Sequence, residues 1–125
     1  MFRVFCVFLY LSVTAVAVSA QERALERAFS EMNAGEWDIA LRVAEQDGLV
    51  ARDVIEWHRL RASQGNVEDA LAFLSRNSDW PGLPYLRKQS ESMLETATTQ
   101  TVLDFFKNGH PQTGAGALAY ALALR

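Results

Sequence analysis

The spacing of apolar residues constrains this chain more than any other feature. From Gln21 onward, apolar residues recur three and four positions apart, which is the spacing of one face of an α-helix. No stretch alternates apolar and polar residues for long enough to predict a β-strand. Glycines and prolines divide the pattern into short segments, because neither residue continues a helix readily. The sequence therefore predicts an all-α fold.

Local stop and start signals mark the expected helix ends. Gly35 and Gly65 each follow an apolar segment, where glycine supplies the left-handed conformation that ends a helix. Asn66 and Thr113 are predicted N-caps, and Pro84 fits the first position of a helix. The predicted core faces are, in chain order, Leu25, Ala28, Phe29 and Met32; Trp37, Ala40, Leu41 and Ala44; Val54, Ile55 and Trp57 with His58; Val67, Ala70, Leu71 and Leu74; Leu86, Ser90, Met93 and Leu94; Val102, Leu103, Phe105 and Phe106; and Leu118, Ala119 and Leu122.

A short pattern repeats within this series at an offset of 30 residues. The two copies are Gly35, Trp37, Ala40 and Leu41, then Gly65, Val67, Ala70 and Leu71. A repeat of this length predicts stacked antiparallel helix hairpins in a superhelical, tetratricopeptide-like solenoid. The alternative is an ordinary helical bundle with one coincidental match. A third copy at Gly116, Leu118, Ala121 and Leu122 carries little weight, because Ala-rich stretches match easily.

The first 20 residues have the pattern of a secretory signal peptide. Arg3 is their only charge, the apolar run Val4–Leu11 follows, and Val18 and Ala20 suit cleavage before Gln21. Removing these 20 of the 125 residues leaves a single expected domain, residues 21–125. The sequence thus predicts a periplasmic protein with no membrane attachment after cleavage.

An uncleaved membrane anchor is the alternative interpretation of this segment. Its apolar run, residues 4–20, is at the short limit of the roughly 17–25 residues that a spanning helix needs. Cys6, the only cysteine, lies inside that run and would be removed by cleavage. At the other end, the seventh helix is expected to be still helical at Arg125. The chain is therefore expected to be truncated at its C-terminus.

Composition and motifs exclude several kinds of site. A net charge of −3 gives no basic field for nucleic acid. His58 and His110 are the only histidines and lie far apart in the sequence, so neither a metal site nor a cofactor is predicted. No serine lies in a Gly-x-Ser-x-Gly turn, and the segment Thr113–Gly116 lacks the lysine of a phosphate loop. No catalytic, cofactor-binding or metal-binding residue is predicted.

Paired carboxylates are the remaining route to chemistry on sugars. Glu91, in a Glu-Ser dipeptide, is the candidate to examine, although Arg87, Lys88 and Glu95 indicate a solvated charged face around it. Tryptophans could also stack on sugars. Two of the three, Trp37 and Trp57, are expected on core faces, whereas Trp80 precedes a proline in a loop and could pack there or meet a ligand.

Four short segments carry a resemblance to a known family. They are Asp-Trp-Pro-Gly-Leu-Pro-Tyr-Leu-Arg at residues 79–87 followed by Glu91, Phe-Phe at 105–106, Pro-Gln-Thr at 111–113 and Gly-Ala-Leu-Ala at 116–119. Together they resemble the N-terminal α-superhelical region of soluble lytic murein transglycosylases, especially the alphaproteobacterial kind. The resemblance spans most of residues 21–125. Its Trp-Pro segment is moderately specific, whereas the helical repeats are generic.

The resemblance implies a role at the cell wall. Enzymes of this family cleave the bond between N-acetylmuramic acid and N-acetylglucosamine in peptidoglycan and leave a 1,6-anhydro sugar. Their catalytic Glu belongs to a C-terminal lysozyme-like domain, in a Glu-Ser motif followed by Gly-Leu-Met-Gln. No such segment follows Glu91, so that role does not carry over to it. The resemblance therefore implies only the superhelical scaffold, which associates with glycan strands and is inactive without its catalytic domain.

Two other functions remain open at this stage. The chain could be a stand-alone periplasmic helical-repeat protein whose concave surface binds a protein partner. It could also be a hydrolase itself, in which case Glu91→Gln would abolish glycan cleavage.

Overall fold

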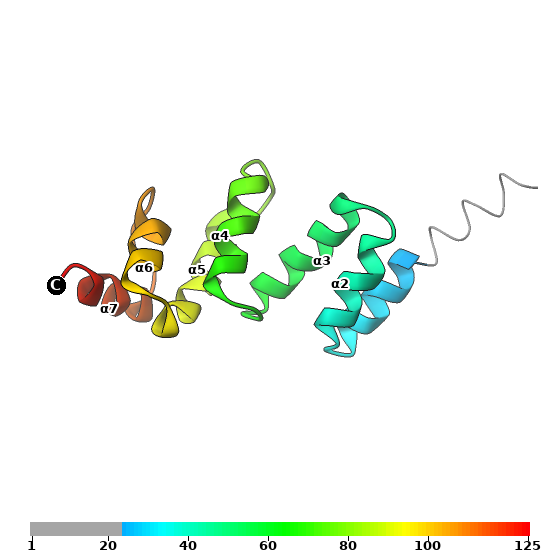
Figure 1. Cartoon of the computed structure of the whole chain (residues 1–125), viewed down its shortest axis with the longest axis horizontal. Helices are drawn as coiled ribbons and strands as arrows, with labels where there is room; N and C mark the ends of the chain where they lie inside the picture. The colour runs from blue at the N-terminus through cyan, green and yellow to red at the C-terminus, as the bar shows by residue number, and fades with distance from the viewer. Residues whose placement is uncertain (1–23) are drawn as a thin grey trace, which may run out of the picture. The chain divides into compact units, whose positions relative to one another are not determined.

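The computed structural model describes residues 24–125, which are helical and contain no strand (Figure 1). The all-α prediction is confirmed for this part of the chain. The predicted signal peptide and its cleavage site lie outside the described residues. None of the helices in residues 24–125 is both long and apolar enough to span a membrane. The elements are a helix at residues 24–33, α2 (Trp37–Glu45), α3 (Leu49–Arg61), α4 (Val67–Arg76), α5 (Leu83–Ser90), the 3-10 helix η1 (Glu91–Thr96), α6 (Thr99–Phe106) and α7 (Gly114–Ala123).

The chain divides into two compact units, one ending at Ile55 and the other beginning at Glu56. The first unit packs the helix at 24–33, α2 and the first part of α3. Small side chains allow these helices to approach closely, and Phe29 and Met32 cover the edge of the cluster. Its buried core consists of Ala28, Ala40, Leu41, Val43, Ala44 and Ile55.

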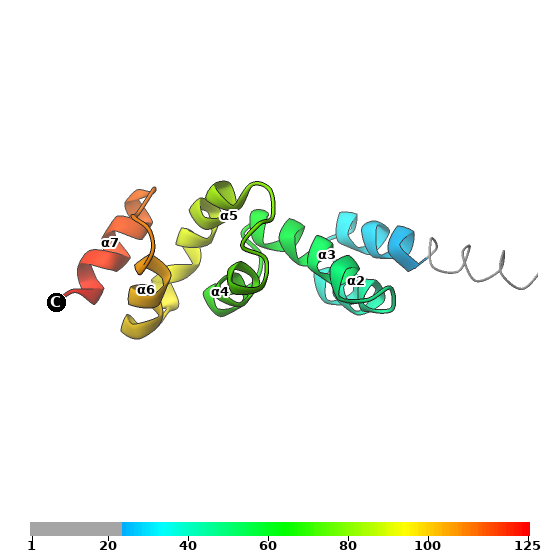
Figure 2. The same ribbon diagram turned by 90° about the horizontal axis from the view of Figure 1, so that it is seen from above.

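The second unit contains two apolar clusters. α5 leads directly into η1, which is followed by α6 (Figure 2). One cluster joins the end of α3 to α4 and α5, and the other joins α4, η1, α6 and α7. The buried residues are Leu60, Ala70, Phe73, Leu74 and Leu86 in the first cluster, and Val67, Leu94, Val102, Phe105 and Phe106 in the second.

The caps explain where several helices begin and end. Gly35 and Gly65 have φ values of 82° and 101°, a region that favours glycine. The side chains of Asn66 and Thr113 accept hydrogen bonds from the N–H groups of Asp69 and Gly116, as N-caps do. The predicted stop at Gly35 and the caps at Asn66 and Thr113 are confirmed. The predicted stop at Gly65 is wrong, because α3 ends at Arg61 and Ser63, with a φ of 56°, is the left-handed residue that closes it.

The two copies of the repeat share three local features, although their N-caps differ: Asn66 caps α4 through its side chain, whereas Glu36 makes no such hydrogen bond to α2. In each, the glycine has positive φ, and the large apolar residue, Trp37 or Val67, is the first residue of its helix. The alanines, Ala40 and Ala70, are fully buried. Gly116 instead lies inside α7, so the third match does not share this geometry.

Three details of the helix boundaries differ from the sequence prediction. Pro84 occupies the second position of α5, after Leu83. The fifth helix changes to 3-10 geometry after Ser90, whose hydroxyl donates to the carbonyl of Leu86 and competes with the backbone ladder. α7 ends at Ala123 rather than continuing to Arg125: the N–H of Leu124 still bonds the Tyr120 carbonyl, whereas that of Arg125 closes a tighter turn on the Leu122 carbonyl.

The predicted buried face of α7 is confirmed at Ala119 and wrong at Leu118 and Leu122. Leu118 and Leu122 are 63% and 54% exposed, whereas Gly116 is buried and Ala119 and Ala123 pack against the second cluster. This helix is apolar on all sides, so the sequence pattern does not show which side is buried.

Candidate functional site

Glu91 is the first residue of η1 and is only 1% exposed. Its Oε1 accepts the N–H of Gln112 at 2.7 Å, and its Oε2 accepts the N–H of Thr113 at 2.7 Å. The Thr113 hydroxyl also donates to Oε2, at 2.5 Å. A carboxylate at this position is favoured by the positive end of the α7 dipole. The hydrogen bonds of Glu91 therefore link the α5–η1 segment to the start of α7.

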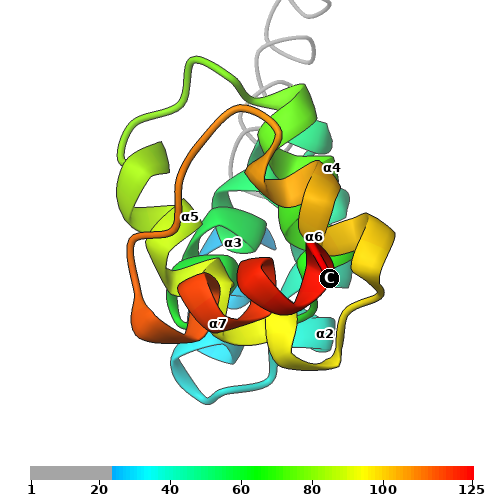
Figure 3. The ribbon, with the colours of Figure 1, turned by 90° about the vertical axis from the view of Figure 1, so that its left-hand side faces the viewer.

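Gly116 makes room for this carboxylate. α7 is nearest the viewer in Figure 3, with the C-terminus beside it. A Cβ at Gly116 would lie 2.3 Å from Oε2 of Glu91, closer than atoms can approach. The N–H of Gly116 donates to the Thr113 hydroxyl at 3.0 Å. The packing between Glu91 and α7 thus requires a glycine here.

The expectation that Glu91 belongs to a solvated charged face is wrong. Its neighbour Lys88 is exposed, but Glu91 lies on the opposite, buried side. Arg87 is also turned inward, and its Nη1 donates to the Phe105 carbonyl at 3.2 Å. Residues that are close in sequence therefore do not share one charged face, because successive side chains of a helix point in different directions.

A cavity of about 390 Å³ adjoins Glu91. Arg87 borders it, and its guanidinium lies 5.6 Å from the Phe105 ring centroid. A general acid must be able to pass a proton to a ligand, whereas both carboxylate oxygens of Glu91 are engaged by N–H and O–H donors of its own chain. The geometry therefore assigns Glu91 a structural role. The cavity lining also includes Leu83, Pro84, Phe106, Gly109, His110 and Gln112.

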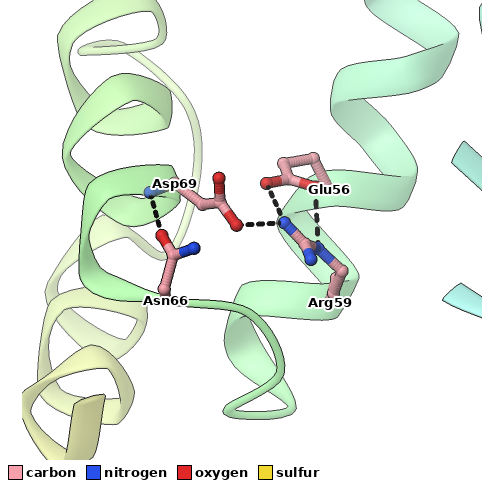
Figure 4. Close-up of polar contacts among 4 residues, drawn as sticks. All are labelled: Glu56, Arg59, Asn66 and Asp69. Atoms are coloured by element: carbon pink, nitrogen blue, oxygen red, sulfur yellow. Dashed lines mark hydrogen bonds and ion pairs between the residues drawn. The ribbon is translucent and has the colours of Figure 1, made fainter. Parts of the chain in front are cut away.

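A charged cluster joins the end of α3 to the start of α4 (Figure 4). Nε and Nη2 of Arg59 donate to the two carboxylate oxygens of Glu56 at 3.0 and 2.9 Å. Nη2 also donates to Asp69 at 2.6 Å, and Asn66 caps the N–H of Asp69. Burial alone lowers the pKa of Arg59, but the hydrogen bonds and charges of Glu56 and Asp69 outweigh burial and raise it. These ion pairs link α3 to α4, and Glu56, Arg59 and Asp69 are called the charged clamp below.

An aromatic and cationic stack lies on α3 and α5. The Arg61 guanidinium carbon is 4.1 Å from the ring centroid of Trp57 and 5.0 Å from that of Tyr85. The Trp57 indole N–H donates to the Pro81 carbonyl at 3.0 Å, which fixes its ring. Tyr85 is 47% exposed. Trp57, Arg61 and Tyr85 are called the stack below.

The two histidines lie in different settings. His58 is on α3, where its ring meets the edge of Trp57 with a centroid distance of 4.9 Å. Burial, and then the charge of Arg61, lower the pKa of His58 below its ordinary value. His110 is exposed in the loop before α7. Within residues 24–125, no group of three or more His, Cys, Asp or Glu side chains is placed to hold a metal ion.

The other two tryptophans are half-buried. Trp80 meets the edge of the buried Phe73 ring, with a centroid distance of 5.3 Å, so it packs the loop against the core. Trp37 begins α2 and is half-buried. The position of Trp57 beside Arg61, four residues later on one helix, could have been noticed in the sequence, since residues at that spacing are neighbours. Tyr85 could not have been added, because only tertiary packing brings α5 to α3.

Searches with this chain against known protein families, curated proteins and solved structures found no match.

Proposed function

We propose that this chain is an exported helical scaffold that associates with peptidoglycan, like the N-terminal region of a lytic transglycosylase. The proposal depends on the contact of Glu91 with the start of α7. Glu91 closes the Trp-Pro segment that resembles the family, and Thr113 and Gly116 belong to the later segments that do so. Glu91 binds Thr113 and packs on Gly116. The segments that resemble the family are thus joined into one structural unit.

In this proposal the chain holds glycan but does not cut it. Both carboxylate oxygens of Glu91 are bound at the N-terminus of α7, and its Glu-Ser dipeptide is not followed by the Gly-Leu-Met-Gln segment of the family's catalytic domain. A lytic reaction requires one carboxyl group that gives and then takes a proton at the glycosidic bond. That group would have to belong to another domain or protein.

The proposed architecture is a solenoid of stacked helix hairpins. Support comes from the two repeats, whose glycine, helix start and buried alanine coincide in local structure. Residues 1–20 would direct the chain to the periplasm, where peptidoglycan lies.

Sedimentation with purified sacculi tests this function. The purified protein is mixed with sacculi and centrifuged, and the protein in the pellet is measured with and without soluble glycan strands as competitor. We expect the protein to pellet with the sacculi and the competitor to release it. Protein that stays in the supernatant would rule out the proposed function.

The second candidate is a helical-repeat protein that binds a protein partner. The observation that favours it is the row of exposed leucines on and after α7, namely Leu118, Leu122 and Leu124. Substituting Leu118 and Leu122 by lysine would then prevent capture of the partner and leave sacculus binding unchanged.

A further inference from the structure

The stack holds a guanidinium in a fixed orientation. Trp57 is anchored by its hydrogen bond to Pro81 and packs against the buried cluster that contains Leu60 and Leu86. Arg61 lies four residues after Trp57 on α3, against this ring, and Tyr85 reaches it from α5. Two independent elements therefore position one cation, which reduces the ordering that a ligand would otherwise impose.

The hydrogen-bonding edge of Arg61 is not used by an acidic side chain. Within residues 24–125, the ion pairs of Arg59 engage Glu56 and Asp69, and Arg61 has no carboxylate within ion-pair distance. Stacking occupies the faces of a guanidinium and leaves its N–H donors, which lie in its plane. Such a fork matches a carboxylate, which it can bind through two parallel hydrogen bonds.

The surroundings of Arg61 add apolar surface beside the charge. Tyr85 is 47% exposed, and its ring adjoins the guanidinium. A ring with an accessible face binds apolar groups and the C–H faces of sugars. The positive charge of Arg61 also reaches His58, whose pKa it helps to lower. A ligand for this surface therefore combines an anionic group with an apolar or sugar ring.

We propose that the stack of Trp57, Arg61 and Tyr85 is a binding site for a free carboxylate on the peptide that is attached to the sugar of peptidoglycan. Arg61 binds the carboxylate through its N–H edge, and the neighbouring sugar or aliphatic group lies on Tyr85. This assignment rests on the proposed function, because it names the part of peptidoglycan that the scaffold recognises.

Titration with a small ligand tests the site. The purified, ¹⁵N-labelled protein is titrated with a muramyl dipeptide that carries a free carboxylate, and in parallel with its methyl ester. The readout is the indole N–H signal of Trp57, identified by its loss in Trp57→Phe. We expect the acid to shift this signal in a saturable way. The ester should bind at least about tenfold more weakly, since a charged hydrogen-bonded pair is lost.

Variants show whether Arg61 is responsible. Arg61→Gln should weaken binding of the acid by about tenfold or more, and Arg61→Lys should also weaken it because a lysine keeps the charge but lacks the planar fork. Arg42→Gln, which removes an exposed arginine of α2, is the matched control and should bind like the parent protein. Tyr85→Ala should weaken binding and retain the preference for acid over ester.

Three results would overturn the site: no shift with the acid at millimolar concentrations, equal binding of acid and ester, or parent-like binding by both Arg61 variants. If Arg61→Gln fails to fold, the binding measured for Arg61→Lys and Tyr85→Ala decides whether the stack is the site. The sacculus assay separates this inference from the proposed function. A parent protein that sediments with sacculi but gives no titration refutes the stack alone. A parent protein that does not sediment refutes the function, and the titration still decides whether the stack binds a carboxylate.

Discussion

The carboxylate of Glu91 accepts three hydrogen bonds from two consecutive residues, Gln112 and Thr113. All three donors lie at the start of α7, and burial excludes water as a replacement. Removing a partner from such a buried group costs more free energy than the bond itself contributes. Glu91 therefore stabilises the folded chain independently of any ligand.

Glu91→Gln should lower the free energy of unfolding by about 2 kcal/mol, because the amide retains one acceptor and turns an N–H₂ group toward donors. Urea denaturation measures the change. Glu95→Gln is the control, since Glu95 is exposed four residues later, and it should change stability little. Equal effects of the two substitutions would contradict the structural role of Glu91.

Gly116→Ala should destabilise the protein by about 1–3 kcal/mol, since its Cβ would overlap the Glu91 carboxylate. The intrinsic helix preference for alanine, about 1 kcal/mol, acts in the opposite direction and is the smaller term. Gly114→Ala is the matched control, because no atom lies within 4 Å of its added Cβ. Thermal unfolding of both variants should show a loss for position 116 only.

His58 should make stability depend on pH. Its folded pKa lies below the ordinary 6.5, so the unfolded chain binds more protons near that pH. The contribution of His58 to the free energy of unfolding is fully present above its pKa in the unfolded chain. It is lost as the pH falls through its pKa in the folded protein. The free energy of unfolding should therefore fall between about pH 7.5 and about pH 5.5, and less steeply in His58→Gln. Parallel curves for the two proteins would contradict this.

At the scale of elements, the α3–α4 connection combines a turn with a charged clamp. Gly65 lies in this connection with positive φ, and a Cβ there would also come within 3.1 Å of the Arg59 guanidinium. Arg59 then joins Glu56 on α3 to Asp69 on α4. The turn and the ion pairs therefore select the same hairpin geometry.

Arg59→Met should cost about 3 kcal/mol, because Glu56 is 4% exposed and would lose its cation. The double variant Glu56→Leu with Arg59→Met should recover part of that loss, since no unpaired buried charge remains. Arg52→Met on the same helix is the control, because Arg52 forms no ion pair in the described part of the chain. Urea denaturation in which the double variant is less stable than Arg59→Met would be the contrary result.

Local signals predicted the helices well because they act within a few residues. The glycines with positive φ, the caps at Asn66 and Thr113, and the buried Ala40 and Ala70 all follow from short-range geometry. The change to 3-10 geometry after Ser90 was not predicted, because it depends on one hydroxyl bonding back to the chain.

The candidate sites were less accessible to sequence reasoning. Glu91 was noticed for its Glu-Ser dipeptide, but its burial depends on donors 21 and 22 residues away. The stack needs Tyr85 of α5 beside Arg61 of α3. Neither pairing has a local signature, so helical periodicity alone could not show them.

At the scale of the whole molecule, the side of α7 that faces solvent is apolar. Leu118 and Leu122 are exposed, and no residue of α7 carries a charged side chain. Contiguous apolar surface of this kind favours association. We expect concentration-dependent self-association in sedimentation velocity, reduced by substituting both leucines with lysine. A sharp, concentration-independent thermal transition of a monomer would contradict this expectation.

The central claim is that the chain holds peptidoglycan without cutting it. The direct measurement incubates purified protein with intact sacculi, then determines both the protein in the pellet and the muropeptides in the supernatant. The account predicts bound protein and no 1,6-anhydro products. Unbound protein, or soluble anhydro products that disappear with Glu91→Gln, would contradict it.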